Sequence, residues 1–136
     1  MNVLIVDDST AMRSIILKTL QISGLEIETV YQAKNGAEAL QVLESNWVDL
    51  ALVDINMPIM DGETLINHIR EDPTLEDLPI VVISTESSEA RIVQLRSKDV
   101  EFIHKPFAPE TLRETVFQLT GADNGTSTLS SGGFDF

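Results

Sequence analysis

The chain alternates between short apolar runs and longer segments with apolar residues at helical spacing. Three nearly continuous apolar runs, at 3–6, 48–53 and 79–83, have strand length, which is typical of strands buried on both faces. An edge strand is predicted at 26–31, where polar and apolar residues alternate, and a last strand at 100–105. Because helical patterns separate all five strands, the sequence predicts a doubly wound α/β protein with a parallel sheet.

Cap and turn residues place helices between these strands. Ser9 or Thr10 can begin the first helix, Asn35 the second, and Pro109 the last. Trp47 is expected to pack in the core near the end of the second helix. One domain is therefore expected over residues 1–120. The remaining residues, 121–136, are rich in glycine, serine and threonine and are expected to form a flexible tail.

Composition narrows the functional classes. The 136-residue chain has a formal net charge of −13, so binding to nucleic acid is not expected. It contains no cysteine, which excludes thiolate chemistry and favours a reducing, cytoplasmic location. No apolar run is long enough for membrane insertion. Positive charge gathers locally at Arg91, Arg96, Lys98, Lys105 and Arg113.

Polar side chains follow four of the predicted strands. Because parallel strands end at the same edge of a sheet, these side chains are expected to meet on one rim. Asp54 ends the central apolar run, and its position makes it a candidate for chemistry. The residues at the strand ends are Asp7, Asp8, Asp54, Ser84, Thr85 and Lys105.

Three carboxylates on one rim repel one another, by up to about 4 kcal/mol per close pair, unless a cation lies among them. The oxygen donors of Asp7, Asp8, Asp54 and the backbone carbonyl of Asn56 favour magnesium (Mg²⁺) over zinc. With Mg²⁺, a hydroxyl group and Lys105, the rim suits a phosphoryl group, which Asp54 would accept as an acyl phosphate. The sequence has no glycine-rich phosphate loop, so the phosphoryl donor is expected to be another molecule.

Short motifs at these strand ends closely resemble those of the receiver domains of two-component response regulators, in particular the free-standing CheY-like chemotaxis regulators. The motifs are Val6-Asp7-Asp8-Ser9 with Met12-Arg13, Asp54-Ile55-Asn56-Met57-Pro58, Asp61-Gly62, Ser84-Thr85-Glu86 and Lys105-Pro106-Phe107. The resemblance covers residues 2 to about 120 and implies the strand order 2-1-3-4-5. Residues 96–100 depart from the family pattern. The family usually has a small, glycine-containing turn before the last strand, and these residues contain no glycine, so the fourth helix is expected to end differently.

The resemblance also implies roles for individual residues. Asp54 resembles the phosphoacceptor, Asp7 and Asp8 the acidic pair that holds magnesium, and Ser84 and Lys105 the groups that contact the phosphoryl oxygens.

A second set of implied roles concerns the response to phosphorylation. Phe102 resembles the switch aromatic of the family, acting with Ser84 and Thr85, and Glu86 is expected to modulate the site. The Lys105–Pro106 peptide bond is expected to be cis.

The favoured interpretation is a monomeric signalling switch that catalyses only its own phosphorylation and dephosphorylation. A histidine kinase would be the phosphodonor, an output protein would bind the face of the fourth helix, fifth strand and fifth helix, and a phosphatase is a further candidate partner.

Two alternatives stay open. One is a phosphorelay intermediate that passes its phosphoryl group to a histidine phosphotransfer domain. The other is a Mg²⁺-dependent small-molecule phosphotransferase or phosphatase of the haloacid-dehalogenase type, which would be expected to carry Asp-x-Asp after the first strand and a cap insertion.

Overall fold

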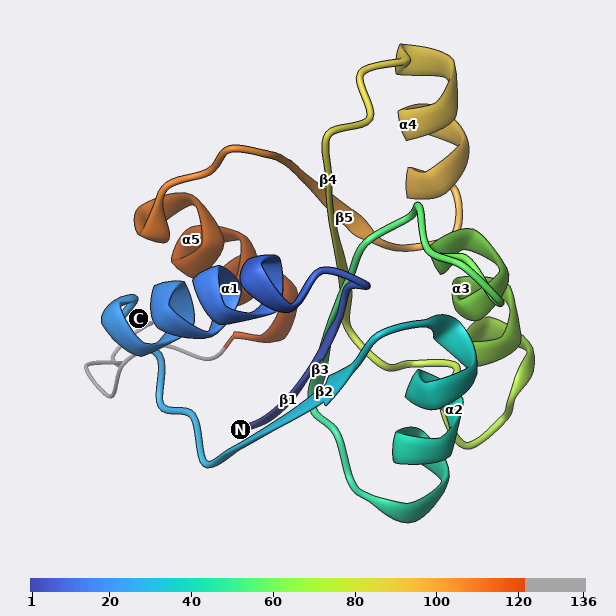
Figure 1. Ribbon diagram of the computed structural model, residues 1–136, viewed down its shortest axis with the longest axis horizontal. Helices are drawn as coiled ribbons and strands as arrows, with labels where there is room; N and C mark the ends of the chain where they lie inside the picture. Colours follow the sequence, from blue (N-terminus) through green and yellow to red (C-terminus); the bar gives the residue numbers. More distant parts are fainter. Residues whose placement is uncertain (122–136) are drawn as a thin grey trace.

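The computed structural model describes residues 1–121 and contains one five-stranded parallel sheet with helices on both faces (Figure 1). The strand order is β2-β1-β3-β4-β5, which confirms the predicted fold class and order. All but the first residue of the predicted tail lie outside the described residues. The strands are β1 (Asn2–Val6), β2 (Thr29–Ala33), β3 (Leu50–Val53), β4 (Ile80–Ser84) and β5 (Glu101–His104).

The five helices divide between the two faces of the sheet. Helices α1 and α5 cover one face, and α2, α3 and α4 lie on the other side (Figure 1). Among residues 1–121, no helix has the length and apolar character needed to cross a membrane. The helices are α1 (Thr10–Ile22), α2 (Gly36–Ser45), α3 (Gly62–Glu71), α4 (Glu89–Arg96) and α5 (Pro109–Thr120).

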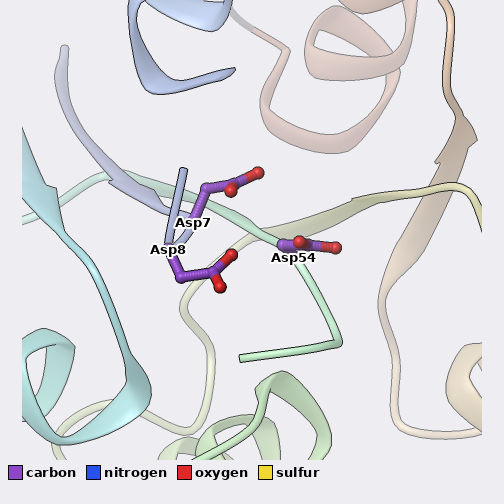
Figure 2. Close-up of side chains that lie close together, drawn as sticks. All are labelled: Asp7, Asp8 and Asp54. Atoms are coloured by element: carbon purple, nitrogen blue, oxygen red, sulfur yellow. The ribbon is translucent and has the colours of Figure 1, made fainter. Parts of the chain in front are cut away.

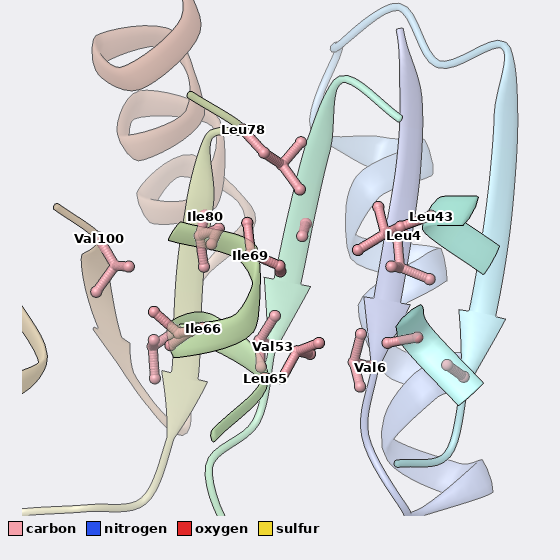
Figure 3. Close-up of a cluster of buried hydrophobic side chains, with 14 of the residues drawn as sticks. Leu4, Val6, Leu43, Val53, Leu65, Ile66, Ile69, Leu78, Ile80 and Val100 are labelled. Atoms are coloured by element: carbon pink, nitrogen blue, oxygen red, sulfur yellow. The ribbon is translucent and has the colours of Figure 1, made fainter. Parts of the chain in front are cut away.

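Alternate residues of each inner strand pack into two separate hydrophobic cores, one on each face of the sheet. In β1, Val3 and Ile5 point to the α1/α5 side, and Leu4 and Val6 point to the α2/α3 side. Figure 3 shows the second core, in which side chains from the sheet meet those of α2 and α3. The central strands are buried on both faces, as their apolar runs predicted, and their ends are therefore held in fixed positions.

Helix starts agree with the predicted caps. Ser9 is the N-cap of α1, and its hydroxyl accepts a hydrogen bond from the backbone N–H of Met12 at 3.1 Å. Asn35 caps α2, where its side chain accepts the N–H of Glu38 at 2.8 Å. Pro109 is the first residue of α5.

Two local predictions were wrong. The edge strand β2 begins at Thr29, three residues later than the alternating pattern indicated. Trp47 is 76% exposed and does not pack in the core. Helix α2 ends at Ser45 and the next residue is extended, so the chain carries the indole outward, where its N–H donates to Asp49 at 2.8 Å.

The turn between α4 and β5 shows how the chain replaces the glycine-containing turn. Asp99 adopts a left-handed conformation with φ of 62°, which aspartate tolerates better than most residues. The Arg70 guanidinium donates to the carbonyls of Lys98 and Asp99 at 3.0 and 2.8 Å. The same guanidinium donates to the carbonyls of Glu76 and Leu78, so one side chain of α3 ties together two turns. The next turn contains the predicted cis peptide bond, Lys105–Pro106.

Candidate functional site

The three predicted carboxylates meet at the carboxyl end of the sheet (Figure 2). Asp7 and Asp8 follow β1, and Asp54 follows β3, whose last residue Val53 pairs with Val6. One oxygen of each carboxylate lies within 4.8 Å of the others. Asp7 is only 2% exposed, Asp54 is half-buried and Asp8 is exposed, so the cluster is closed on the inside and open to solvent on the outside.

Lys105 reaches this cluster from the opposite side of the rim. It follows β5, and its backbone N–H donates to the carbonyl of Ser84 at 2.9 Å. Its Nζ donates to Asp7 Oδ2 at 3.1 Å and lies 3.8 Å from Asp54 Oδ2. The lysine therefore offsets part of the negative charge of Asp7 and Asp54.

The environment of Asp54 makes its carboxyl harder to ionise than a carboxyl group in water, as its raised pKa shows. Burial raises the pKa of the Asp54 carboxyl, and the charges of Asp7 and Asp8 add to this effect. Lys105 and the backbone N–H of Ile55, which donates to Asp54 Oδ1 at 2.8 Å, lower the pKa but do not cancel the rise. A bound cation would favour the charged form that a nucleophile requires.

The donor set fits Mg²⁺. All three clustered ligands are carboxylate oxygens, the hard ligands that this ion prefers, and the exposed side of the cluster leaves space for waters. Receiver domains bind Mg²⁺ at an acidic pocket of this kind. Asn56 lies exposed two residues after Asp54, and the use of its backbone carbonyl as a further ligand stays a prediction.

The hydroxyl residues lie on the neighbouring strand. Ser84 is the last residue of β4 and is completely buried, and its Oγ accepts the N–H of Glu86 at 3.1 Å. Thr85 is exposed, and the Glu86 carboxylate accepts the N–H of Ser88 at 3.1 Å. Two hydrogen bonds therefore link Ser84 to Glu86 and Glu86 to Ser88, which is the N-cap of α4.

Phe102 lies in β5 beside Val82 and is partly buried against the α2/α3 core. This location is compatible with the predicted switch role, which stays a prediction.

Part of the positive charge that gathers at residues 91–113 is paired with one acidic residue of α3. Glu63, in the first turn of α3, pairs with Arg91 at 3.1 Å and with Lys98 at 3.8 Å, and it accepts a hydrogen bond from Gln94 at 3.0 Å. Glu63 is therefore already paired with Arg91 and Lys98, two of the five cations that gather in this part of the sequence. Sequence reasoning missed Glu63 because its residue type and position indicate only a favourable charge at a helix start.

A second missed residue is Arg13 of α1. Its Nη1 donates to the carbonyl of Asp7 at 2.7 Å, and its Nε donates to Gln32 at 3.0 Å, so it fixes the chain where the acidic pair begins. The motif that contains Arg13 was the available signal, although it indicated no contact.

The fold and the acidic rim together define a CheY-like α/β protein. The family model of the response regulator receiver domain matches residues 3–117, and the chain belongs to this family. It is 37% identical over 126 residues to the chemotaxis protein CheY1 of Helicobacter pylori, covering 91% of this chain and 100% of that protein. It is 36% identical over 120 residues to the chemotaxis protein CheY-3 of Vibrio cholerae, covering 88% and 91%. The solved structure of the chemotaxis response regulator CheY4 of Vibrio cholerae has a TM-score of 0.74 and 34% identity, covering 87% of this chain and 97% of that chain.

Proposed function

We propose that the protein is a single-domain response regulator that a histidine kinase phosphorylates on Asp54 in a chemotaxis pathway. The observation that carries this proposal is the placement of a half-buried carboxylate within reach of Asp7, Asp8 and Lys105, with one side of the cluster open. The chemotaxis pathway is supported by similarity to CheY proteins over nearly the full length of both chains.

In the proposed reaction an Asp54 carboxylate oxygen attacks phosphorus. The new O–P bond forms as the P–N bond of the donor phosphohistidine breaks, and the imidazole nitrogen keeps the bonding electron pair. Lys105 would contact a phosphoryl oxygen, and the Ser84 hydroxyl would donate a hydrogen bond to another. When bound, Mg²⁺ supplies positive charge that stabilises the phosphoryl oxygens in the transition state.

The experiment is phosphorylation by acetyl phosphate in the presence of Mg²⁺, read as acid-labile label on the intact chain. We expect label in the wild type and none in Asp54→Asn or after addition of EDTA. Asp77→Asn, which changes an exposed carboxylate in a loop, should label normally. Undiminished label in Asp54→Asn, or full label in EDTA, would refute the proposal.

The output is proposed to be a change of the α4/β5/α5 face in which Ser84 moves toward the phosphoryl group and Phe102 turns inward. Phosphorylation should tighten partner binding by about 5–150-fold, the usual scale of such coupling. The proposal is supported by the burial of Ser84 and by the partly buried position of Phe102 at the sheet edge.

Amide NMR shifts on addition of beryllofluoride, a phosphoryl analogue, test this output. In the wild type we expect shifts both around Asp54 and across residues 89–120. Phe102→Ala should keep the first set and lose most of the second. Tyr31→Ala removes a partly buried aromatic ring from the other edge strand and should keep both sets. If Phe102→Ala keeps both sets as well, Phe102 carries no signal.

The enzyme alternative is less well supported. Asp54 follows the third strand, and the described residues 1–121 contain no cap insertion between the strands. Both features differ from those expected of a haloacid-dehalogenase-type phosphotransferase or phosphatase.

A further inference from the structure

The amino-terminal end of the sheet carries a cleft that the proposed function does not use. The cleft has a volume of about 510 Å³ and lies between the loops that precede β3 and β4. Residues 43–49 form one wall, and most of residues 73–79 form the other. Both loops lie in the lower part of Figure 1, whereas the acidic cluster lies beyond the carboxyl ends of the same strands.

The lining of this cleft combines an apolar floor with negative charge. Leu43, Val48 and Leu78 are nearly buried and supply the floor. The carboxylates of Glu44 and Asp77 are exposed on opposite walls. No lysine or arginine of the described chain lines the cleft. A ligand that enters must therefore bring its own positive charge or leave the carboxylates to water.

Trp47 stands at this cleft in a fixed orientation. Its side chain is 76% exposed, yet its indole N–H donates to Asp49 Oδ1 at 2.8 Å. The other carboxylate oxygen of Asp49 accepts the backbone N–H of Asn2 at 2.7 Å, and the Asn2 side chain donates to the Trp47 carbonyl at 3.1 Å. A large aromatic surface is thus held out in solvent, at a hydrophobic cost that a bound partner would remove.

The opposite wall is also ordered before any ligand binds. The N–H and hydroxyl of Thr74 both donate to Asp72 Oδ1, at 2.9 and 2.8 Å, and the N–H of Leu78 donates to the carbonyl of Leu75 at 2.9 Å. Arg70 fixes the end of this loop through the Leu78 carbonyl at 2.8 Å. Because both walls are preorganised, binding would cost little loop entropy.

We propose that this cleft binds an arginine-containing basic peptide segment of a protein partner. A guanidinium group can stack on the indole of Trp47 and pair with the carboxylate of Asp77 or Glu44, which the compact ammonium group of lysine does less well. An aliphatic side chain of the same segment would cover the apolar floor. An acidic segment would be repelled by the lining. The inference does not depend on phosphorylation of Asp54.

Trp47 is the only tryptophan of the chain, so its fluorescence reports directly on this cleft. The full chain is titrated with a capped hexapeptide of alternating leucine and arginine, and with the matched peptide of leucine and glutamate. We expect a saturable change in emission with the arginine peptide alone, and amide NMR shifts concentrated in residues 43–49 and 73–79. Raising the salt from about 50 to about 500 mM should weaken binding because it screens the exposed carboxylates.

Charge variants test the assignment of the ligand to the cleft. Asp77→Asn should weaken binding of the arginine peptide by about twofold to fivefold. Glu114→Gln removes the same charge from the exposed surface of α5 and should leave the affinity within about twofold. Equal binding of the glutamate peptide, equal weakening in both variants, or NMR shifts around Asp7 and Asp54 instead of the cleft would overturn the proposal.

Discussion

Substitution of Gly62 by alanine would push the start of α3 against the backbone of the phosphoacceptor. Gly62 is the first residue of α3, and its N–H donates to the carbonyl of Ile55 at 2.9 Å. A Cβ at this position would lie 2.1 Å from the carbonyl oxygen of Asp54 and 2.9 Å from Ile55 Cα. Opening the shorter contact even to 3.0 Å requires a displacement of about 0.9 Å, and backbone atoms cannot rotate away as a side chain can.

The expected loss in the free energy of unfolding of Gly62→Ala follows from three contributions. Overpacking of a well-packed site costs about 1–3 kcal/mol, and strain or loss of the Gly62–Ile55 hydrogen bond costs about 1 kcal/mol more. Alanine returns up to about 1 kcal/mol through its higher helix propensity. We therefore expect Gly62→Ala to lower the free energy of unfolding by about 2 kcal/mol. Since the added Cβ would clash with the backbone of Asp54, the phosphorylation rate should also fall, by as much as about 100-fold for a displacement near 1 Å.

Gly36→Ala is the matched control, because Gly36 is also the first residue of its helix. Its Cβ would meet Met60 side-chain atoms at 2.7 and 2.8 Å, and a flexible methionine can move aside. We expect a loss below about 1 kcal/mol and a normal phosphorylation rate. Urea denaturation and acetyl phosphate labelling of both variants provide the two measurements. If Gly62→Ala matches Gly36→Ala in both stability and rate, the steric reasoning is wrong.

Three further predictions concern charged side chains away from the acidic cluster. The backbone N–H of Asn2 lowers the pKa of the Asp49 carboxyl, so the charged form adds stability above its unfolded pKa of about 4, and this stability is lost as the pH falls through the lower folded pKa. Asp49→Asn should therefore destabilise the protein at pH 7 by about 1 kcal/mol and by less at pH 3 in urea titrations, and an equal effect at both pH values would count against this origin. Glu63→Gln weakens the polar link between α3 and α4 and should speed amide hydrogen exchange in α4, whereas unchanged exchange would show that the link does not restrain the helix. Arg70→Lys cannot reproduce the contacts to four carbonyls and should cost about 2 kcal/mol by urea denaturation, a reasoning that fails if the variant is as stable as the wild type.

The meeting of Asp7, Asp54 and Lys105 could be predicted from the sequence because it follows from strand direction alone. Each residue follows or ends a predicted strand, and parallel strands end at one edge whatever their lateral order. The order itself does not follow from the runs, since Leu50–Val53 would look the same in the middle of the sheet or beside an edge. It came from the resemblance of the motifs to a family, and the structure has the same order.

Side chains whose role depends on a distant partner escaped prediction. Trp47 looked like core because apolar aromatic residues usually are, and only the extended turn after α2 and the bond to Asp49 place it outside. Glu63 and Arg91 are 28 positions apart, and no periodic pattern indicates that α4 passes beside α3. Hydrophobic periodicity describes one element at a time, whereas such ion pairs are set by how two elements pack.

Strand β3 connects the two ends of the sheet, since Asp49 anchors Trp47 just before it and Asp54 stands just after it. All four residues of β3 are buried, and the strand pairs with β1 on one side and β4 on the other. It therefore has no second arrangement through which phosphorylation of Asp54 would change the cleft. The proposed conformational change instead passes across the sheet, through Ser84 of β4 and Phe102 of β5. Addition of beryllofluoride should therefore leave the affinity of the arginine peptide within about twofold, far less than the coupling expected at the α4/β5/α5 face. A shift of tenfold or more in the Trp47 titration, which would be a coupling of about 1.4 kcal/mol, would show that β3 transmits the signal after all.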